Sequence, residues 1–186
     1  MVTVLIPLAQ GCEELEAVTI IDLLRRADIK VVTASLDERP VTASRGTKIL
    51  ADTTLDQVLD HEFDMVVLPG GLPGSDYLNE DDRIHQILQH AANNNKPIGA
   101  ICAAPKVLAS AGLLKNKKAT AYPGVLEGLK LDSTVVTNAA VQQDGNIFTS
   151  RGPGTAMDFA LEIISCLKGI EKRNQVEADL QREVTI

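Results

Sequence analysis

The sequence predicts one α/β domain in which helices cover both faces of a mostly parallel sheet. Short apolar runs, typical of buried strands, alternate with segments of helical periodicity. No repeat, low-complexity tract or linker divides the 186 residues, so we expect a single domain over residues 1–186. In such sheets the ligand crevice lies beyond the carboxyl ends of the strands. We therefore expect the functional residues at that edge.

The composition argues against several classes of protein. A net charge of −7 disfavours a nucleic acid or an anionic membrane as partner. No run approaches the roughly 20 apolar residues of a membrane span. Met1–Leu8 is apolar but lacks the basic start of a signal peptide. Three widely spaced cysteines do not form a disulfide framework, so we expect a reducing, cytoplasmic setting.

Local signals place the individual elements. Strands are predicted where short apolar runs lie between turn residues, at Thr3–Leu8, Lys30–Ser35, Val41–Ser44, Lys48–Ala51, Met65–Leu68, Pro97–Ile101, Ala119–Tyr122, Thr134–Thr137, Ala139–Gln142 and Ile147–Thr149. Helices are predicted at Glu13–Arg26, Asp82–Ala92, Ala104–Ala111, Thr155–Leu167 and Ile170–Gln181. Thr54 and Gln57 form a capping box for one further short helix that ends at Leu59. In the first helix we expect the apolar stripe at Leu15, Val18, Ile21 and Leu24.

The strongest functional signal lies at Cys102, in the turn between the predicted strand Pro97–Ile101 and the predicted helix Ala104–Ala111. Small residues flank the cysteine, as a tight nucleophile elbow requires. The N–H groups at the helix start favour a thiolate, so we expect a lowered pKa for the sulfur. A buried cysteine that packs as a small hydrophobic residue fits the same stretch equally well.

Two further loops reach the same edge of the sheet. Pro69–Gly74 follows a strand directly and presents backbone rather than side chains. The loop after the first strand holds Glu13, Glu14 and Glu16, which raise one another's pKa. One of them can act as a proton carrier, but acids also favour a helix start, and spacing alone does not rank the three.

Other reactive residues offer weaker signals. His61, His85 and His90 are expected on the surface, away from the carboxyl ends of the strands. No zinc-ligand spacing or nucleotide-binding motif is present. Cys12 is either a spectator or a second redox-active thiol, and Cys166 is expected in the core.

Four motifs, taken in order, resemble the ThiJ/PfpI superfamily: Gly11-Cys-Glu-Glu-Leu-Glu16, Leu68-Pro-Gly-Gly71, Ala100-Ile-Cys-Ala-Ala-Pro105 and Ser150-Arg-Gly-Pro-Gly-Thr155. The resemblance runs from Val2 to about Leu180. It is greatest to the branch of the parkinsonism-associated protein deglycase and the bacterial YajL-type proteins. It implies a flavodoxin-like α/β sandwich with a mostly parallel central sheet and a cysteine nucleophile elbow, and a homodimer.

The same resemblance implies a set of site residues. The reactive cysteine falls on Cys102 and its protonated partner carboxyl on Glu16. The amides that would hold an oxyanion belong to Gly71 and Ala103, and the supporting residues are Gly70, Arg45 and Glu13. No metal and no cofactor are implied.

Helical spacing also bears on the choice among the acids. Residues three apart share a helix face, so Glu13 and Glu16 stack while Glu14 turns away by roughly 100°. Partial cover over Glu16 would raise its pKa.

Two departures from the family pattern narrow the chemistry. Peptidase-like members follow the elbow cysteine with histidine, whereas position 103 is alanine, which disfavours protease activity. Human-type relatives place a histidine near the cysteine where this chain has Tyr122. A Cys–Glu pair is therefore the working mechanism.

The resemblance implies a cysteine-dependent glyoxalase or deglycase. Its substrates would be methylglyoxal-type α-oxoaldehydes, or the early adducts that they leave on protein and nucleotide amines. The alternative is a redox sensor or oxidative-stress chaperone in which Cys102 is oxidised to sulfinate.

Overall fold

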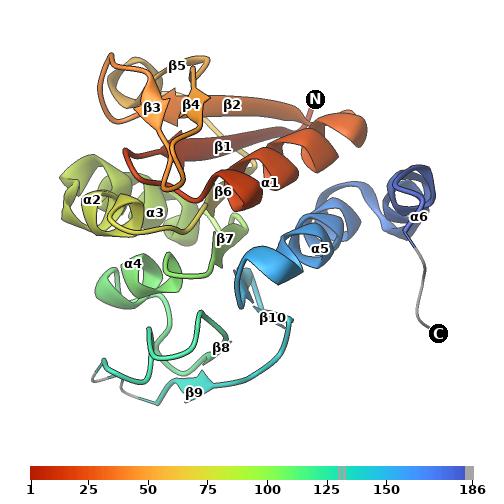
Figure 1. Ribbon diagram of the computed structural model, residues 1–186. Coiled ribbons are helices and arrows are strands. Elements are labelled where there is room, and N and C mark those ends of the chain that lie inside the picture. The colour runs from red at the N-terminus through yellow and green to blue at the C-terminus, as the bar shows by residue number, and fades with distance from the viewer. Residues whose placement is uncertain (130, 132, 183–186) are drawn as a thin grey trace.

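A seven-stranded sheet forms the centre of the computed structural model, within the described residues 1–129, 131 and 133–182 (Figure 1). The prediction of one domain over residues 1–186 includes 130, 132 and 183–186, which lie outside the described residues. In spatial order the strands are β10 (Val141–Asp144), β11 (Ile147–Ser150), β7 (Ile98–Ile101), β6 (Met65–Leu68), β1 (Thr3–Leu8), β2 (Lys30–Ser35) and β5 (Thr53–Thr54). All neighbours pair in parallel except β10 and β11, so the predicted mostly parallel sheet is confirmed.

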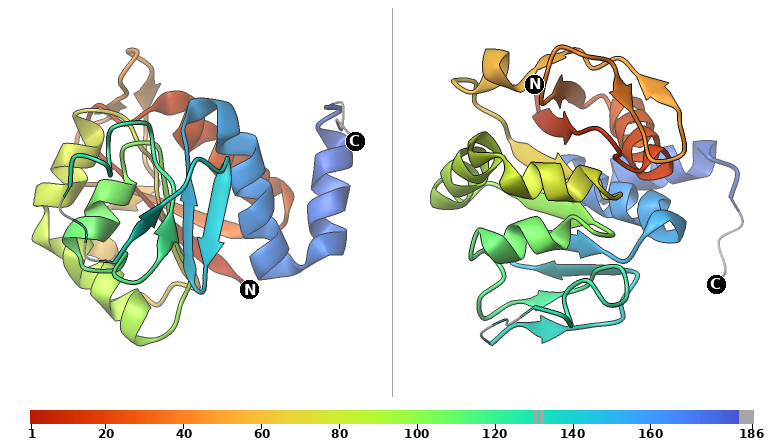
Figure 2. Two further views of the ribbon diagram at one scale, coloured as in Figure 1. Left: turned by 90° about the horizontal axis from the view of Figure 1, so that it is seen from below. Right: turned by 60° about the vertical axis from the view of Figure 1, so that its left-hand side comes forward.

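Helices cover both faces of this sheet, as Figure 2 shows in its left view. One layer contains α1 (Glu14–Arg26), α5 (Ala156–Lys168) and α6 (Ile170–Asp179), and the other contains α2 (Gly74–Glu80), α3 (Asp82–Asn93) and α4 (Pro105–Ser110). Alternate strand residues feed the two cores: Val4 and Ile6 pack with the first layer, and Leu5 packs with the second. The α/β sandwich predicted from the sequence is therefore confirmed. No described helix combines the length and apolar composition that a membrane crossing requires.

Smaller elements complete the chain. They are the hairpin β3 (Val41–Thr42) and β4 (Lys48–Ile49), the parallel pair β8 (Lys118–Ala119) and β9 (Val135–Val136), and the 3₁₀ turns η1 (Leu55–Val58) and η2 (Pro153–Thr155). The predicted hairpin around Arg45-Gly46 is confirmed, with shorter strands.

Three local predictions were wrong. The helix α2 was not expected, because its short sequence begins with glycine after a proline-rich turn. The strand predicted over Ala119–Tyr122 ends at Ala119, because the N–H of Thr120 bonds a side chain, Thr149 Oγ1, at 2.9 Å. Thr54 does not cap the following turn; Thr53 Oγ1 instead donates to Gln57 Oε1 at 2.7 Å.

The apolar stripe predicted for α1 was partly wrong: Leu24 is buried and Ile21 packs against the core, but Leu15 and Val18 do not belong to the buried face. The buried face is formed by Ala17, Ile20, Leu23 and Leu24, together with Glu16. Leu15 and Val18 are 51% and 49% exposed. The helix therefore has a second apolar face, and only one of the two faces packs on the sheet.

At the carboxyl edge of the sheet the loop after β1 packs directly on the loop after β6. The backbone N–H of Glu13 donates to the carbonyl of Gly70 at 2.9 Å. Gly71 has a φ of +92°, and a Cβ there would lie 2.4 Å from the nitrogen of Glu13. Only glycine fits both the dihedral angle and the contact.

We predict that Gly71→Ala destabilises the protein by about 1–3 kcal/mol more than Gly46→Ala, because the new methyl group collides with backbone that cannot move aside. Gly46 is the matched control, since its φ is +95° but nothing lies within 4 Å of its would-be Cβ. Urea unfolding of both variants gives the comparison. Equal losses of stability would show that the dihedral angle alone requires glycine at position 71.

Candidate active site

Three loops meet at this edge, after the neighbouring strands β1, β6 and β7. They bring together five of the residues expected from the sequence: Glu16, Gly70, Gly71, Cys102 and Ala103. A Cβ at Gly70 would lie 2.7 Å from both Cys102 Cβ and Glu16 Oε2. A side chain at position 70 would therefore collide with both Cys102 and Glu16, a constraint that the sequence pattern does not reveal.

Cys102 occupies a strained turn between β7 and α4. Its φ is +62°, which is uncommon for a residue with a side chain. Two backbone hydrogen bonds of 2.9 Å hold it there, from its own N–H to Ser150 O and from the N–H of Tyr122 to its carbonyl. The side chain is 8% exposed. This geometry is that of a nucleophile elbow, in which strain persists because the surrounding structure enforces it.

Glu16 is fully buried in the first turn of α1. Its Oε2 accepts the N–H of Gly70 at 2.9 Å, while its buried Oε1 has no hydrogen-bond partner of normal geometry among the described residues. Burial raises the pKa of Glu16 to about 7, against the lowering effect of hydrogen bonds with Cys102 and Gly70. The predicted covered and weakly acidic Glu16 is confirmed, and near neutral pH this carboxyl can both hold and release a proton.

The prediction of an acidic thiol at Cys102 is contradicted. Burial raises its pKa to about 12, and the charge and hydrogen bond of Glu16 act in the same direction. The N–H groups of Ala103 and Gly71 bond the sulfur and lower its pKa, but less. The helix α4 has only six residues, which limits the field at its start. Protonation of Glu16 removes the charge that opposes the thiolate, so it lowers the pKa of Cys102, although burial still raises it.

The other two acids have separate roles. Glu13 caps α1, accepting the N–H of Glu16 at 2.8 Å. Glu14 points away to the β3–β4 hairpin, where it accepts the N–H of Arg45 at 3.0 Å. As the helical spacing predicts, Glu13 and Glu16 lie together and Glu14 turns away from them. Arg45 touches this cluster through its backbone, its side chain is exposed, and its supporting role stays a prediction.

The remaining candidates lie apart from the site or serve it indirectly. His61 and His90 are exposed, and the partly covered His85 contacts Asn79 O at 2.9 Å. Cys12 is fully buried, and burial raises its pKa to about 12. Cys166 is exposed on α5, so the prediction that it lies in the core was wrong. Among the described residues no group of three or more His, Cys, Asp or Glu is placed to hold a metal ion.

The pKa of Glu16 predicts a pH dependence of stability. Because it rises from an ordinary 4.5 to about 7, the folded state binds more protons between these pH values. The associated stability is fully present below pH 4.5 and is lost as pH rises to about 7. Relative to wild type, Glu16→Gln should gain up to about 3 kcal/mol across this range, measured by urea unfolding at successive pH values.

Glu162→Gln is the control for this measurement, since Glu162 is exposed and makes no ion pair within the described part of the chain. Its stability curve should run parallel to that of wild type. A Glu16→Gln curve that also runs parallel would contradict the raised pKa.

Comparison with known proteins identifies the family. The DJ-1/PfpI family profile matches residues 2–166. The chain is 45% identical to Protein DJ-1 homolog B of Arabidopsis thaliana over 93% of its length, but spans only 40% of that longer protein. It is 45% identical to Protein dj-1beta of Drosophila melanogaster, covering 95% of each chain. The glutathione-independent glyoxalase DJR-1.2 of Caenorhabditis elegans is 34% identical, with 90% of this chain and 89% of that protein covered.

Solved structures agree. The crystal structure of Drosophila melanogaster DJ-1beta superimposes with a TM-score of 0.94 and 43% identity, covering 98% of this chain and 99% of that one. Oxidized Toxoplasma gondii DJ-1 gives a TM-score of 0.94 and 36% identity, covering 99% and 100%. The fold is therefore the flavodoxin-like α/β fold of these proteins, and the chain belongs to the DJ-1/PfpI family.

Proposed function

We propose that the protein is a cofactor-independent glyoxalase or deglycase in which Cys102 is the nucleophile and Glu16 the proton shuttle. The observation that carries the proposal is the buried carboxyl beside the elbow cysteine, with a pKa of about 7. A glyoxalase name on a relative of 34% identity supports the reaction class. The substrate would be a methylglyoxal-type α-oxoaldehyde or its early adduct on a protein or nucleotide amine.

The first step is addition of the sulfur to the aldehyde carbon. Glu16 holds a proton while the Cys102 thiolate attacks, and the carbonyl electron pair moves to oxygen. The N–H groups of Gly71 and Ala103, which bond the sulfur in the free protein, would hold the resulting oxyanion. Glu16 gives its proton to that oxygen, which completes a hemithioacetal and leaves Glu16 as the carboxylate.

The second step moves hydrogen between the two carbons of the substrate. The Glu16 carboxylate takes the proton from the carbon bonded to sulfur, and the electron pair forms a double bond to the neighbouring carbon, whose oxygen is protonated. Glu16 then returns that proton to the neighbour, which becomes an alcohol. The hydroxyl on the first carbon gives up its proton, which balances the one taken up by the neighbour's oxygen, and the first carbon becomes a thioester.

Water completes the reaction by cleaving the thioester, which releases a hydroxyacid and restores the Cys102 thiol. One carbon is oxidised by two electrons and the other is reduced by two, so no external oxidant or reductant enters the balance. For a hemiaminal adduct the sulfur would displace the amine, which leaves with a proton, and the resulting hemithioacetal would then follow the same steps.

We predict that the purified protein converts methylglyoxal to lactate, that Cys102→Ala abolishes this, and that Glu16→Gln lowers turnover by about 10²-fold or more. The glutamine keeps a hydrogen-bond donor but cannot transfer a proton. Lactate formed per unit time is the measurement, with Cys166→Ala as the control that retains wild-type rates. If Glu16→Gln turned over methylglyoxal as fast as wild type, the assignment of Glu16 as the proton shuttle would be wrong.

Redox sensing is the second candidate, because a relative of the same fold has been solved in an oxidized form. Cys102 would then be oxidised to sulfinate by peroxide, and Glu16 would hydrogen-bond the product. A protein that forms no hydroxyacid, but whose Cys102 alone gains two oxygen atoms by mass spectrometry, would favour this reading. All three cysteines are free, which suits the reducing cytoplasm that we propose as location.

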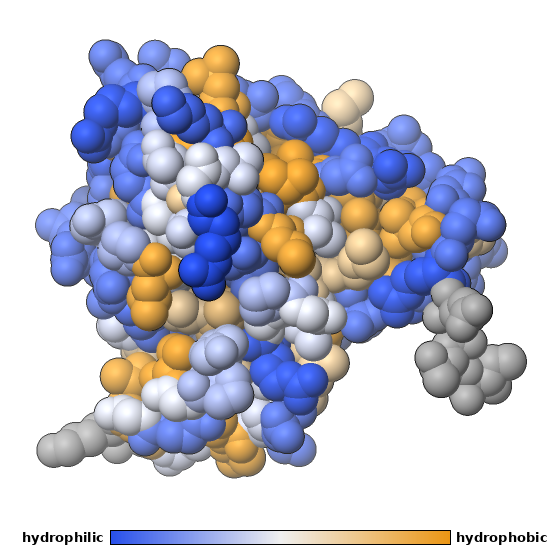
Figure 3. Space-filling view, viewed as in Figure 1, coloured by the Kyte–Doolittle hydropathy of each residue, from blue (hydrophilic) through white to orange (hydrophobic). Residues whose placement is uncertain are grey.

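We further propose a homodimer built on the outer face of α1. Leu15 and Val18 are both about half exposed on this helix. In Figure 3 apolar side chains gather over α1 and towards α5 on this side of the molecule. An apolar patch of this kind on a small protein is typical of a protein–protein contact.

We predict that light scattering gives twice the 19.9 kDa chain mass at micromolar concentration and that Val18→Glu lowers it toward that of one chain. A charge buried at a dimer contact has no partner there, which opposes association. Ile170→Glu, on the equally exposed Ile170 of α6, should leave the dimer intact. A wild-type mass of one chain would end the proposal.

A further inference from the structure

Glu14 is an acidic residue that the proposed reaction leaves unused, yet its carboxylate is fully engaged. Its Oε2 accepts the Ser44 hydroxyl at 3.0 Å, and its two oxygens accept the backbone N–H of Arg45 at 3.0 and 3.1 Å. Oε1 also accepts the N–H of Thr47 at 3.3 Å. One side chain thus accepts hydrogen bonds from three residues in the turn of the β3–β4 hairpin, Ser44, Arg45 and Thr47.

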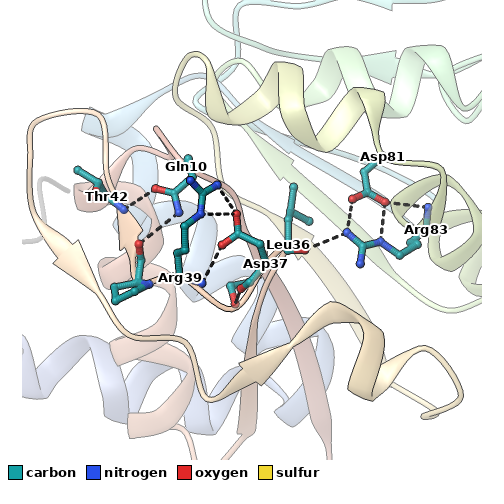
Figure 4. A network of polar contacts seen from close by, with 9 residues as sticks. Gln10, Leu36, Asp37, Arg39, Thr42, Asp81 and Arg83 are labelled. Carbon is teal, nitrogen blue, oxygen red and sulfur yellow. Dashed lines mark hydrogen bonds and ion pairs between the residues drawn. The ribbon is translucent and has the colours of Figure 1, made fainter.

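The turn of this hairpin also has two backbone hydrogen bonds of its own, from the N–H of Ala43 to Thr47 O at 2.8 Å and from the N–H of Gly46 to Ala43 O at 3.0 Å, but the hairpin is short. Each of its strands has two residues, and a two-stranded hairpin of that size is marginal in water. At its base the Gln10 amide braces the chain, donating to Pro40 O at 3.2 Å and accepting the N–H of Thr42 at 2.9 Å (Figure 4). The base is therefore fixed by Gln10 and the turn by Glu14.

The hairpin in turn fixes the loop after β1. The N–H of Gly11 donates to Thr42 O, and the N–H of Ser44 donates to Cys12 O, both at 2.8 Å. Ser44 therefore touches Glu14 through its hydroxyl and the loop through its backbone. A hairpin that moved would release both bonds.

That loop lies against the backbone whose amide faces the nucleophile. Gly74 approaches Cys12 so closely that a Cβ would lie 2.6 Å from its nitrogen, and Gly71 approaches Glu13 more closely still. The preceding residue, Gly70, lies so close to Cys102 that a Cβ there would be 2.7 Å from the Cys102 Cβ, and the N–H of Gly71 lowers the pKa of the Cys102 sulfur. Backbone packed on backbone transmits a displacement instead of absorbing it.

We propose that Glu14 is a positioning residue: by pinning the turn from Ser44 to Thr47 it fixes the loop at residues 11–13, and through it the Gly71 amide beside Cys102. The inference rests on the proposed function for its effect on turnover. Glu14 itself touches no reacting atom. Its pKa falls to about 2, because the hydrogen bonds of the turn outweigh the opposing effect of burial, so the anchor stays charged at working pH.

The test uses both sides of the contact, in Glu14→Gln and Ser44→Ala. A glutamine nitrogen has no lone pair, so it would face the N–H donors of the turn without accepting from them. We expect kcat for methylglyoxal to fall roughly tenfold in Glu14→Gln, with KM changed less than about twofold, because an oxyanion contact acts mainly in the transition state. In Ser44→Ala we expect a smaller fall in kcat, because Glu14 keeps its hydrogen bonds with the N–H groups of Arg45 and Thr47.

A double-mutant cycle then tests whether the losses of kcat in the two single variants come from their shared contact or from separate, unrelated effects on the fold. If both residues act through one contact, Glu14→Gln with Ser44→Ala is no slower than Glu14→Gln alone. Rates are taken per active site, titrated by alkylation of Cys102, so that a mere loss of folded protein does not count. Glu162, whose exposed side chain forms no hydrogen bond with the part of the chain that the structure describes, provides the control variant Glu162→Gln, which should match wild type.

The rate of Cys102 alkylation by iodoacetamide is a second readout that needs no turnover. Loss of the Gly71 amide from the sulfur should slow it several-fold in Glu14→Gln. Unchanged kcat and unchanged alkylation would overturn the proposal, as would additive losses in the double variant. A wild-type protein without hydroxyacid formation would refute the proposed function alone, and the alkylation rates would still decide the role of Glu14.

Discussion

A carboxyl and a thiol are buried beside each other at the edge of the sheet, and burial makes a negative charge on either of them expensive. Two charges there would repel in a poorly solvated space, so the pair holds at least one proton near neutral pH. The surroundings of the site are arranged around that proton. Gly70 has no side chain because one would fill the space between Cys102 and Glu16, and the amides of Gly71 and Ala103 offer the sulfur the only compensation that the described backbone provides.

Much of this arrangement follows from local sequence. The positions of most strands and helices were predicted closely. They depend on apolar runs and helical periodicity, which are properties of residues near one another in the sequence. The elbow at Cys102 and the outward turn of Glu14 depend on spacing along one or two elements. The family motifs then selected Glu16 among three acids that spacing could not rank.

The failures all depend on contacts between distant segments. Leu15 and Val18 were wrongly expected in the buried stripe of α1 because the helix has two apolar faces, and packing on the sheet decides which one is buried. The shift in the pKa of Cys102 was predicted in the wrong direction. The helix start that would lower this pKa is local in sequence, whereas the burial and the Glu16 carboxyl that raise it come from elsewhere in the chain. Cys166 was placed in the core by pattern, yet its side of α5 faces outward.

Three consecutive residues at the start of α1 face three different surroundings: Glu14 the hairpin, Leu15 the solvent-exposed side and Glu16 the thiol. Their separation is angular, about 100° per residue. A substitution at one position leaves the other two in place, but the loss or gain of a single residue before them rotates all three at once. After a gain, Glu14 would face solvent and Leu15 would face the sulfur; after a loss, Glu16 would face solvent and Ala17 would face the sulfur. Evolution of this segment can therefore proceed by replacement, while insertions and deletions are confined to loops beyond it.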